Sequence, residues 1–210
     1  MCSPAETPAA TETQSLAAAS LSPGLSVPMF TRLESTPQLR QGLIIRETEV
    51  LEDYREIDGE LHISSVLYPY LLVISQSCDL EHHYGCIEKG KSEDKVLPCA
   101  LLLPLYNYLH VKSGEHLSHL DRRMQIWSSK TKIELLQNNE IPRYHYLKFS
   151  KNDPLVDSVL DFKHAVAPSF DSVHRCLGTC IVGIINPPYI DRISQRFANF
   201  VSRIGLPEAP

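Results

Sequence analysis

The sequence lacks the short motifs that mark the commonest nucleotide-dependent and hydrolytic enzymes. It has no glycine-rich phosphate-binding loop, no Rossmann fingerprint, no His-Glu-x-x-His and no Gly-x-Ser-x-Gly. No apolar run is long enough to cross a bilayer, and the first residues lack the basic and apolar regions of a secretory signal. We therefore set those enzyme classes aside as first choices, and we expect a cytoplasmic protein without a membrane partner.

Length and composition suit one globular domain behind a tail. The chain has 210 residues, of which 43% are hydrophobic and 21% are charged, so a sizeable core can form. Residues 1–28 are rich in Ala, Ser, Thr and Pro and carry little that could be buried, which predicts a disordered tail. The remaining pattern predicts a single domain over residues 40–207.

Charge is unevenly distributed along the chain. The net charge is −5, yet residues 1–60 hold ten acidic and four basic residues, whereas residues 91–151 hold ten basic and six acidic ones. A general polyanion binder is not expected, because such affinity needs clustered Lys and Arg. The segment 91–151 could still contact RNA, and its alternative is a solvated surface of mixed charge.

Apolar periodicity predicts several strands and two helices. Strand-like segments occur at residues 42–46, 70–76, 96–105, 143–149, 156–163 and 180–185. Residues 47–60 suggest a hairpin or connecting loop with Asp58-Gly59 as its turn, and residues 81–95 suggest a loop. Ser128 or Ser129 could cap a short helix that runs through Asn138.

The terminal helix is the strongest helical prediction. Asn186 can cap it, and Pro187 or Pro188 suits its first turn. Gly205 and Pro207 would stop it. Its apolar face recurs at helical spacing through Ile190, Ile193, Phe197, Phe200 and Ile204.

The most informative stretch is the end of the apolar strand at residues 70–76, which leads into Ser75, Gln76, Ser77, Cys78 and Asp79. Cys78 is a candidate nucleophile, with His82 or His83 as its base and Asp79 orienting the imidazole. Adjacent strand residues point to opposite faces, so Cys78 and Asp79 share a site only if the strand ends by Ser77. The alternatives are that Cys78 caps the core while Asp79 bonds turn amides, or that Cys78 is a metal ligand.

The cysteines and histidines do not show the spacing of a structural zinc site. Six cysteines are present, and in a cytosolic protein they are more often free thiols or core residues than disulfides. Cys176 and Cys180 only loosely approximate a zinc knuckle, and His110, His116 and His119 form a further cluster. We predict neither a metal site nor a cofactor, with a zinc-stabilised structural protein as an alternative.

Two further groups of charged residues are candidates for binding. Asp157 and Asp161 would share one face of a strand, where they could hold a cation or act as an acid–base pair; the alternative is a solvated face. Arg192, Arg196 and Arg203 lie away from the apolar face of the terminal helix. They could meet phosphate or a partner's carboxylate, or simply be solvated.

Residues Ser75-Gln76-Ser77-Cys78-Asp79 resemble the Ser-Gln-x-Cys-Asp motif of a group of uncharacterised bacterial and phage-associated proteins. The same group is similar at Asp161-Phe162 and at Phe197–Pro207, so the resemblance covers most of residues 40–207. It implies a bacterial setting connected with defence or mobile elements, and it implies no particular activity.

A second resemblance is to the toxin endoribonucleases of the MazF/PemK type. Gly42-Leu43-Ile44, Tyr68-Pro69 followed by an apolar strand, and Ala100–Leu105 follow that family's layout over residues 41–105. The resemblance implies a small SH3-like barrel. The family's arginine before the proline is Tyr68 here, and its threonine after the later proline is Leu105, which puts the ribonuclease mechanism in doubt.

Together these observations predict an α+β protein with a mainly antiparallel SH3-like barrel, a short helix and an amphipathic C-terminal helix. The leading hypothesis is an interaction module that binds another protein, or RNA, through the rim around Ser75–His83, with Asp161, Arg196 and Arg203 as further binding residues. One alternative is a thiol enzyme that uses Cys78 with His82, His83 or His145 as base. A divergent toxin-like ribonuclease is another.

Overall fold

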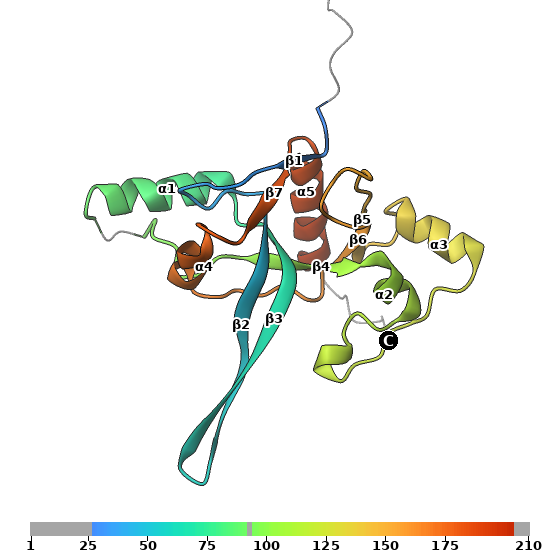
Figure 1. Ribbon diagram of the computed structural model, residues 1–210, viewed down its shortest axis with the longest axis horizontal. Helices are drawn as coiled ribbons and strands as arrows, with labels where there is room; N and C mark the ends of the chain where they lie inside the picture. The colour runs from blue at the N-terminus through green and yellow to red at the C-terminus, as the bar shows by residue number, and fades with distance from the viewer. Residues whose placement is uncertain (1–26, 92–93, 204–210) are drawn as a thin grey trace, which may run out of the picture.

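One antiparallel sheet forms the framework of the computed structural model, which describes residues 27–91 and 94–203. The strands are β1 (Phe30–Arg32), β2 (Leu43–Ile57), β3 (Glu60–Val73), β4 (Leu102–Asn107), β5 (Tyr144–Leu147), β6 (Ser158–Asp161) and β7 (Ile181–Ile185). They pair in the order β1-β7-β2-β3-β4-β6-β5. The sheet is open, with β1 and β5 at its edges (Figure 1). The α+β class is therefore confirmed, whereas a closed SH3-like barrel is not.

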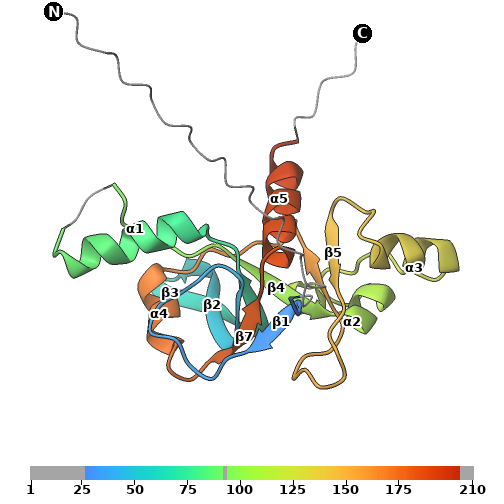
Figure 2. The ribbon, with the colours of Figure 1, turned by 90° about the horizontal axis from the view of Figure 1, so that it is seen from above.

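Helices flank this sheet at both ends. They are α1 (Ser77–Glu88), α2 (Tyr108–Ser113), α3 (Lys130–Gln137), α4 (Phe170–Cys176) and α5 (Tyr189–Val201), with a short 3-10 helix η1 (Ser118–Leu120). In both ribbon views α1 and α4 lie at one end of the molecule and α2 and α3 at the other (Figures 1 and 2). The predicted short helix is α3, and its Ser129 side chain accepts the Lys132 N–H as expected for an N-cap. Helices α2 and α4 were not predicted.

The central strands are buried on both faces, as their continuous apolar runs predict. On β2, Leu43 and Ile45 join a core cluster with Leu80 of α1 and Phe170 of α4. The residue between them, Ile44, belongs instead to a second cluster, which includes the buried residues of α5. Because successive side chains of a strand point to opposite faces, the sheet lies between two layers of core.

The prediction of a loop over residues 81–95 is wrong for its first half, because α1 continues to Glu88. Gln76 has an extended backbone and precedes the helix, and Asp79 lies in its first turn, where a carboxylate favours the positive end of the helix dipole. The buried positions are Leu80, His83 and Cys86, each three residues apart, and Leu80 packs into the core. Because this buried face includes a histidine and a cysteine, the apolar periodicity of the segment is too weak to predict a helix.

The ends of the domain differ slightly from prediction. Strand β1 pairs with β7, so the fold begins before residue 40. Helix α5 begins after Pro188 and buries Ile190 and Ile193 as predicted. The predicted tail over residues 1–28 falls almost wholly outside the described residues, and Ile204, Gly205 and Pro207 fall outside them too. No helix in the described part of the chain is long and apolar enough to span a bilayer.

The most prominent feature is a long hairpin, β2–β3, whose outer half extends well beyond the body of the molecule (Figure 1). Its turn is Asp58-Gly59, as predicted, and both residues have positive φ, at 54° and 82°. This is the combination required by a type I′ hairpin turn. Of the two structures predicted for residues 47–60, a hairpin or a connecting loop, the hairpin is confirmed, because β2 continues to that turn. We call residues 47–67 the arm.

Candidate functional site

The strand-exit segment, Ser75–His83, changes direction between β3 and α1. Ser75 fixes the exit, because its Oγ accepts the Leu101 N–H at 2.8 Å. Ser77 donates to Gln41 Oε1 at 3.2 Å, and the Gln41 amide donates in turn to Ser194 Oγ of α5 at 2.9 Å. Strand β3 ends at Val73, so Cys78 and Asp79 lie in the first turn of a helix rather than on alternate faces of a strand.

Cys78 is exposed and has acceptors for neighbours. Its Sγ lies 3.7 Å from Gln76 Oε1 and 3.7 Å from Asp79 Oδ1, so the single S–H can donate to either oxygen. His82 is exposed on the same helix, and no hydrogen bond between it and Cys78 is present among the described residues. This environment supplies no cation and no histidine in contact with the sulfur. Of the features that stabilise a cysteine thiolate, it offers only the N-terminus of a helix.

The two other histidines named as bases are core residues. His83 accepts the Leu97 N–H on Nδ1 at 2.9 Å, its ring lies 3.8 Å from that of Phe170, and burial lowers its pKa. His145 is buried on β5 beside Phe162. In both ribbon views β5 lies far from α1, so His145 and Cys78 do not form one site (Figures 1 and 2).

Asp161 is fully buried, so the alternative of a solvated strand face is wrong for this residue. Arg143 binds it with two parallel hydrogen bonds, Nε to Oδ1 at 2.7 Å and Nη2 to Oδ2 at 2.5 Å. His116 Nε2 lies 3.4 Å from Oδ2. Burial acts to raise the pKa of Asp161, but the hydrogen bonds from His116 and Arg143 outweigh it and lower that pKa to about 2. Asp157 instead accepts the Tyr146 hydroxyl at 2.6 Å, so the two carboxylates have separate partners.

The arginines of α5 have different roles in the structure. The Nη2 of Arg196 donates to the carbonyls of Ile141 and Tyr144, both at 3.0 Å, and so ties the helix to the loop before β5. Arg203 is exposed; its guanidinium lies 4.0 Å from the Phe200 ring and donates to the Phe200 carbonyl. Arg196 is thus engaged by backbone, whereas Arg203 remains accessible to a partner.

A histidine–tyrosine cluster that the sequence did not predict lies where the arm joins the body. It consists of Glu52, Tyr68, Tyr106, His119 and His164. The Tyr68 hydroxyl donates a hydrogen bond to Glu52. It therefore accepts a hydrogen bond from His164 Nε2, which lies 3.1 Å away. A neutral imidazole then accepts on Nδ1, and Tyr106 donates there. The result is a hydrogen-bonded chain in which each group donates to the next, from Tyr106 through His164 and Tyr68 to Glu52.

Burial sets the protonation of this cluster. It raises the pKa values of Tyr68 and Tyr106, and it lowers those of His119 and His164. The tyrosines and histidines are therefore neutral at neutral pH, and Glu52 is the final acceptor of the hydrogen-bonded chain. Because Glu52 and Tyr68 belong to the hairpin and His164 and Tyr106 to the body, these bonds fix the angle of the arm.

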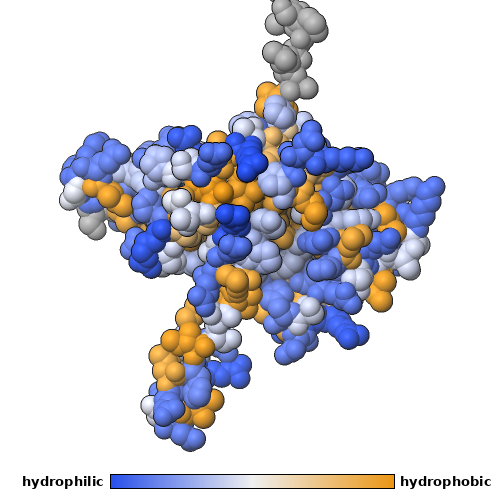
Figure 3. Space-filling model, viewed as in Figure 1, coloured by the Kyte–Doolittle hydropathy of each residue, from blue (hydrophilic) through white to orange (hydrophobic). Residues whose placement is uncertain are grey.

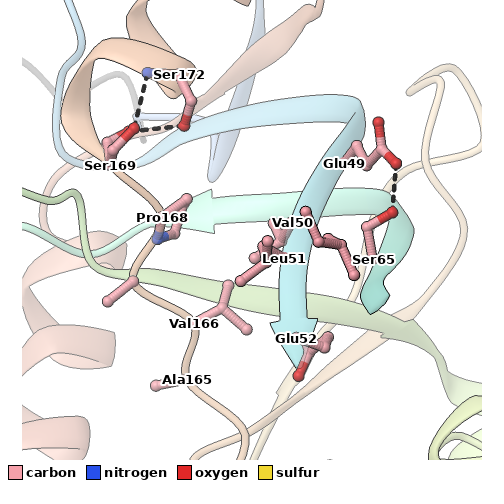
Figure 4. Close-up of a pocket in the computed structure, with 12 residues that line it drawn as sticks. Glu49, Val50, Leu51, Glu52, Ser65, Ala165, Val166, Pro168, Ser169 and Ser172 are labelled. Atoms are coloured by element: carbon pink, nitrogen blue, oxygen red, sulfur yellow. Dashed lines mark hydrogen bonds between the residues drawn. The ribbon is translucent and has the colours of Figure 1, made fainter. Parts of the chain in front are cut away.

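A cavity of about 700 Å³ lies at the base of the arm (Figure 4). Its walls come from β2 and β3 on one side and from the segment before α4 on the other, namely Glu49, Val50, Leu51, Glu52, Ile63, Ser65, Ala165, Val166, Ala167, Pro168, Ser169 and Ser172. Glu49 accepts the Ser65 hydroxyl across the hairpin (Figure 4). The cavity and the outer arm form one continuous surface, since Leu51 and Ile63 belong to both.

The outer arm is amphipathic. Cross-strand pairing places Tyr54 opposite Ile63, Glu56 opposite Leu61 and Glu49 opposite Leu67. Because paired residues share a face and faces alternate along a strand, one face carries Leu51, Tyr54, Leu61, Ile63 and Leu67. These five side chains are 55–69% exposed. The hydropathy surface shows the same apolar patches along the protruding arm (Figure 3).

Comparison with protein-family models, with curated proteins and with solved structures found no match. Within the described residues, no group of three or more His, Cys, Asp or Glu side chains could hold a metal ion. His110, His116 and His119 therefore do not form a metal site in this part of the chain, and the zinc-stabilised alternative gains no support.

Acid sensitivity is expected from His145. Burial, followed by the charges of Arg196 and Arg192, lowers its pKa to about 3. The unfolded chain takes up this proton near pH 6.5 and the folded protein does not, so the stabilisation is complete above about pH 6.5 and is lost as pH falls. Between about pH 6.5 and 4.5 the free energy of unfolding falls by about 2–3 kcal/mol through this residue.

The measurement is urea unfolding of wild type and of His145→Gln across that pH window. The variant should lose about 2–3 kcal/mol less than wild type over the window, and the matched exposed change His62→Gln should follow wild type. An equal pH dependence of wild type and His145→Gln would contradict the assignment.

Proposed function

We propose that this chain is a protein-interaction module whose docking element is the arm. The observation that carries the proposal is the row of five exposed large apolar side chains on one face of a protruding ribbon. Soluble monomers rarely leave contiguous apolar patches uncovered unless a partner binds there. A two-stranded hairpin is also marginally stable in water by itself, so its exposed face gains from being covered.

The net charge of the arm indicates what kind of surface its partner presents. Residues 47–67 contain seven acidic residues and one basic residue, a net charge of −6 with histidine neutral. Two of the acidic side chains, Glu49 and Glu56, lie on the apolar face. A complementary partner presents an apolar surface with a basic rim. The same charge repels phosphates, so the arm does not favour RNA.

The strand-exit rim is a second contact region in this proposal. Ser75, Gln76 and Asp79 line an apolar groove of about 480 Å³, whose other wall includes Phe197 and Val201 of α5. A setting in defence or mobile elements also belongs to the proposal, on the sequence resemblance alone. The thiol-enzyme and toxin-like ribonuclease alternatives have less support, because Cys78 lacks a contacting base and the sheet is open.

The test compares matched apolar substitutions on and off the arm. The arm variant combines Leu51→Gln, Tyr54→Gln and Ile63→Gln. The control variant combines Leu109→Gln, Ile126→Gln and Val156→Gln, which are similarly exposed apolar residues elsewhere. Each full-length protein is immobilised, incubated with lysate of the source cells, and its bound proteins are identified and then purified for affinity measurement.

We expect one basic protein that wild type and the control variant bind equally. The arm variant should bind it at least about tenfold more weakly, and raising the ionic strength from about 0.05 to 0.5 M should weaken binding further. Equal binding by the arm variant would refute the apolar face of the arm as the docking surface. Tight binding of a labelled single-stranded RNA by all three proteins would favour the RNA alternative through residues 91–151.

A further inference from the structure

Two cysteines meet at the end of α4, apart from the arm's exposed face. Cys176 is the last residue of the helix, and Cys180 immediately precedes β7. The Cys180 N–H donates to the Cys176 carbonyl at 3.0 Å, and so does the Thr179 N–H. This single closed turn brings the two cysteines close together, and each thiol shifts the pKa of the other, in opposite directions.

The two thiols have different surroundings. Cys176 is half-buried, whereas Cys180 is buried within the core. In its neutral form Cys176 donates to the Val173 carbonyl at 3.0 Å. The neighbouring Cys180 thiol, and to a smaller extent Thr48, lower the pKa of Cys176 to about 6 against the opposing effect of burial. The same interaction between the two thiols, together with burial, raises the pKa of Cys180.

We propose that Cys176 and Cys180 form a redox-active dithiol whose oxidant is a small hydroperoxide. The Cys176 thiolate attacks the outer oxygen of the hydroperoxide, so that an S–O bond forms, the O–O bond breaks and the alcohol or water leaves after taking a proton. Cys180 then attacks the sulfenic sulfur, which forms the disulfide and releases water. Two thiols and one hydroperoxide thus give one disulfide, one alcohol or water, and one water.

The geometry favours this assignment over the other uses of paired cysteines. The more accessible thiol is also the one whose pKa is lowered, and the enclosed thiol adjoins it as the resolving partner, which is the arrangement of redox-sensing pairs. Only a small oxidant suits a half-buried sulfur. A metal would need further ligands, and the described residues provide no group of three or more around these two.

The first test follows disulfide formation in the full chain. The reduced protein is treated with equimolar hydrogen peroxide at neutral pH, alkylated and digested, and the peptides are analysed by mass spectrometry. We expect an intramolecular Cys176–Cys180 disulfide, while Cys78, Cys86 and Cys99 remain alkylated as internal references. In Cys180→Ser the reaction should stop at the Cys176 sulfenic acid, which dimedone traps.

The second test needs no variant and separates an activated thiol from a merely adjacent pair. Iodoacetamide labelling of Cys176 in the native protein should reach half its maximal rate near pH 6 and level off, because the thiolate is then fully formed. If Cys176 instead labels with the pH profile of an ordinary thiol near pH 8.5, or if peroxide leaves the pair reduced while it oxidises the reference cysteines, the proposal is wrong.

Discussion

Replacing Arg143 with leucine is expected to lower the free energy of unfolding by about 3–5 kcal/mol. The side chain of Asp161 is wholly enclosed, and Arg143 binds both of its oxygens. Without Arg143 the carboxylate keeps only the His116 contact at 3.4 Å and the Lys163 N–H at 3.0 Å. A buried charge with too few partners either destabilises the fold or takes up a proton.

The measurement is urea unfolding at neutral pH, with Arg55→Leu as the matched control. Arg55 also pairs with an aspartate, Asp53, at 2.6 Å, but those two side chains are 75% and 47% exposed. Water screens such a pair, so its loss should cost less than about 1 kcal/mol. The double change Arg143→Leu with Asp161→Leu should recover part of the lost stability, because neither charge then remains buried. If Arg143→Leu and Arg55→Leu lost equal amounts of unfolding free energy, burial of the ion pair would not determine its contribution to stability.

Local signals in the sequence were sufficient to predict several elements. Asp58-Gly59 predicted the hairpin turn because few residue pairs adopt two successive positive φ values. The pair Ser128 and Ser129 predicted the start of α3 because a hydroxyl there can accept an otherwise unpaired helix N–H, and Ser129 is the residue that does so. The apolar spacing of Ile190 and Ile193 predicted the buried face of α5. Each of these signals depends on residues a few positions apart.

Where the prediction failed, the deciding contacts are distant in sequence. His83 appeared to be a polar loop residue, yet it packs on Phe170 and so helps to bury α1. Asp161 was predicted to be either a binding carboxylate or a solvated one, and its burial depends on Arg143, eighteen residues before it. The histidine–tyrosine cluster combines β2, β3, β4, η1 and the loop after β6. The MazF/PemK resemblance predicted a closed barrel, but strand order in a sheet is likewise set by long-range pairing.

Shortening the arm is expected to abolish partner binding and leave the body intact. The variant removes residues 54–57 and 60–63, four from each strand, and keeps Asp58-Gly59 as the turn. Asp53 already pairs with Ser64, so those two residues would flank the shortened turn in the original register. Removing equal, even numbers of residues preserves the face of every remaining side chain.

All eight deleted residues are exposed, so the free energy of unfolding should change by less than about 1 kcal/mol. Glu52 and Tyr68 remain, and with them the hydrogen-bonded chain that fixes the arm's base. Affinity for the captured partner should nevertheless fall at least about tenfold, because Tyr54, Leu61 and Ile63 are lost.

Comparison with the full-length arm variant, in which Leu51, Tyr54 and Ile63 are glutamine, separates two explanations. If apolar contact drives docking, both variants lose binding to a similar extent. If only the reach of the arm matters, the full-length variant keeps its affinity and the shortened one does not. Full affinity in both variants would place the docking surface elsewhere on the molecule, with the strand-exit rim as the next region to substitute.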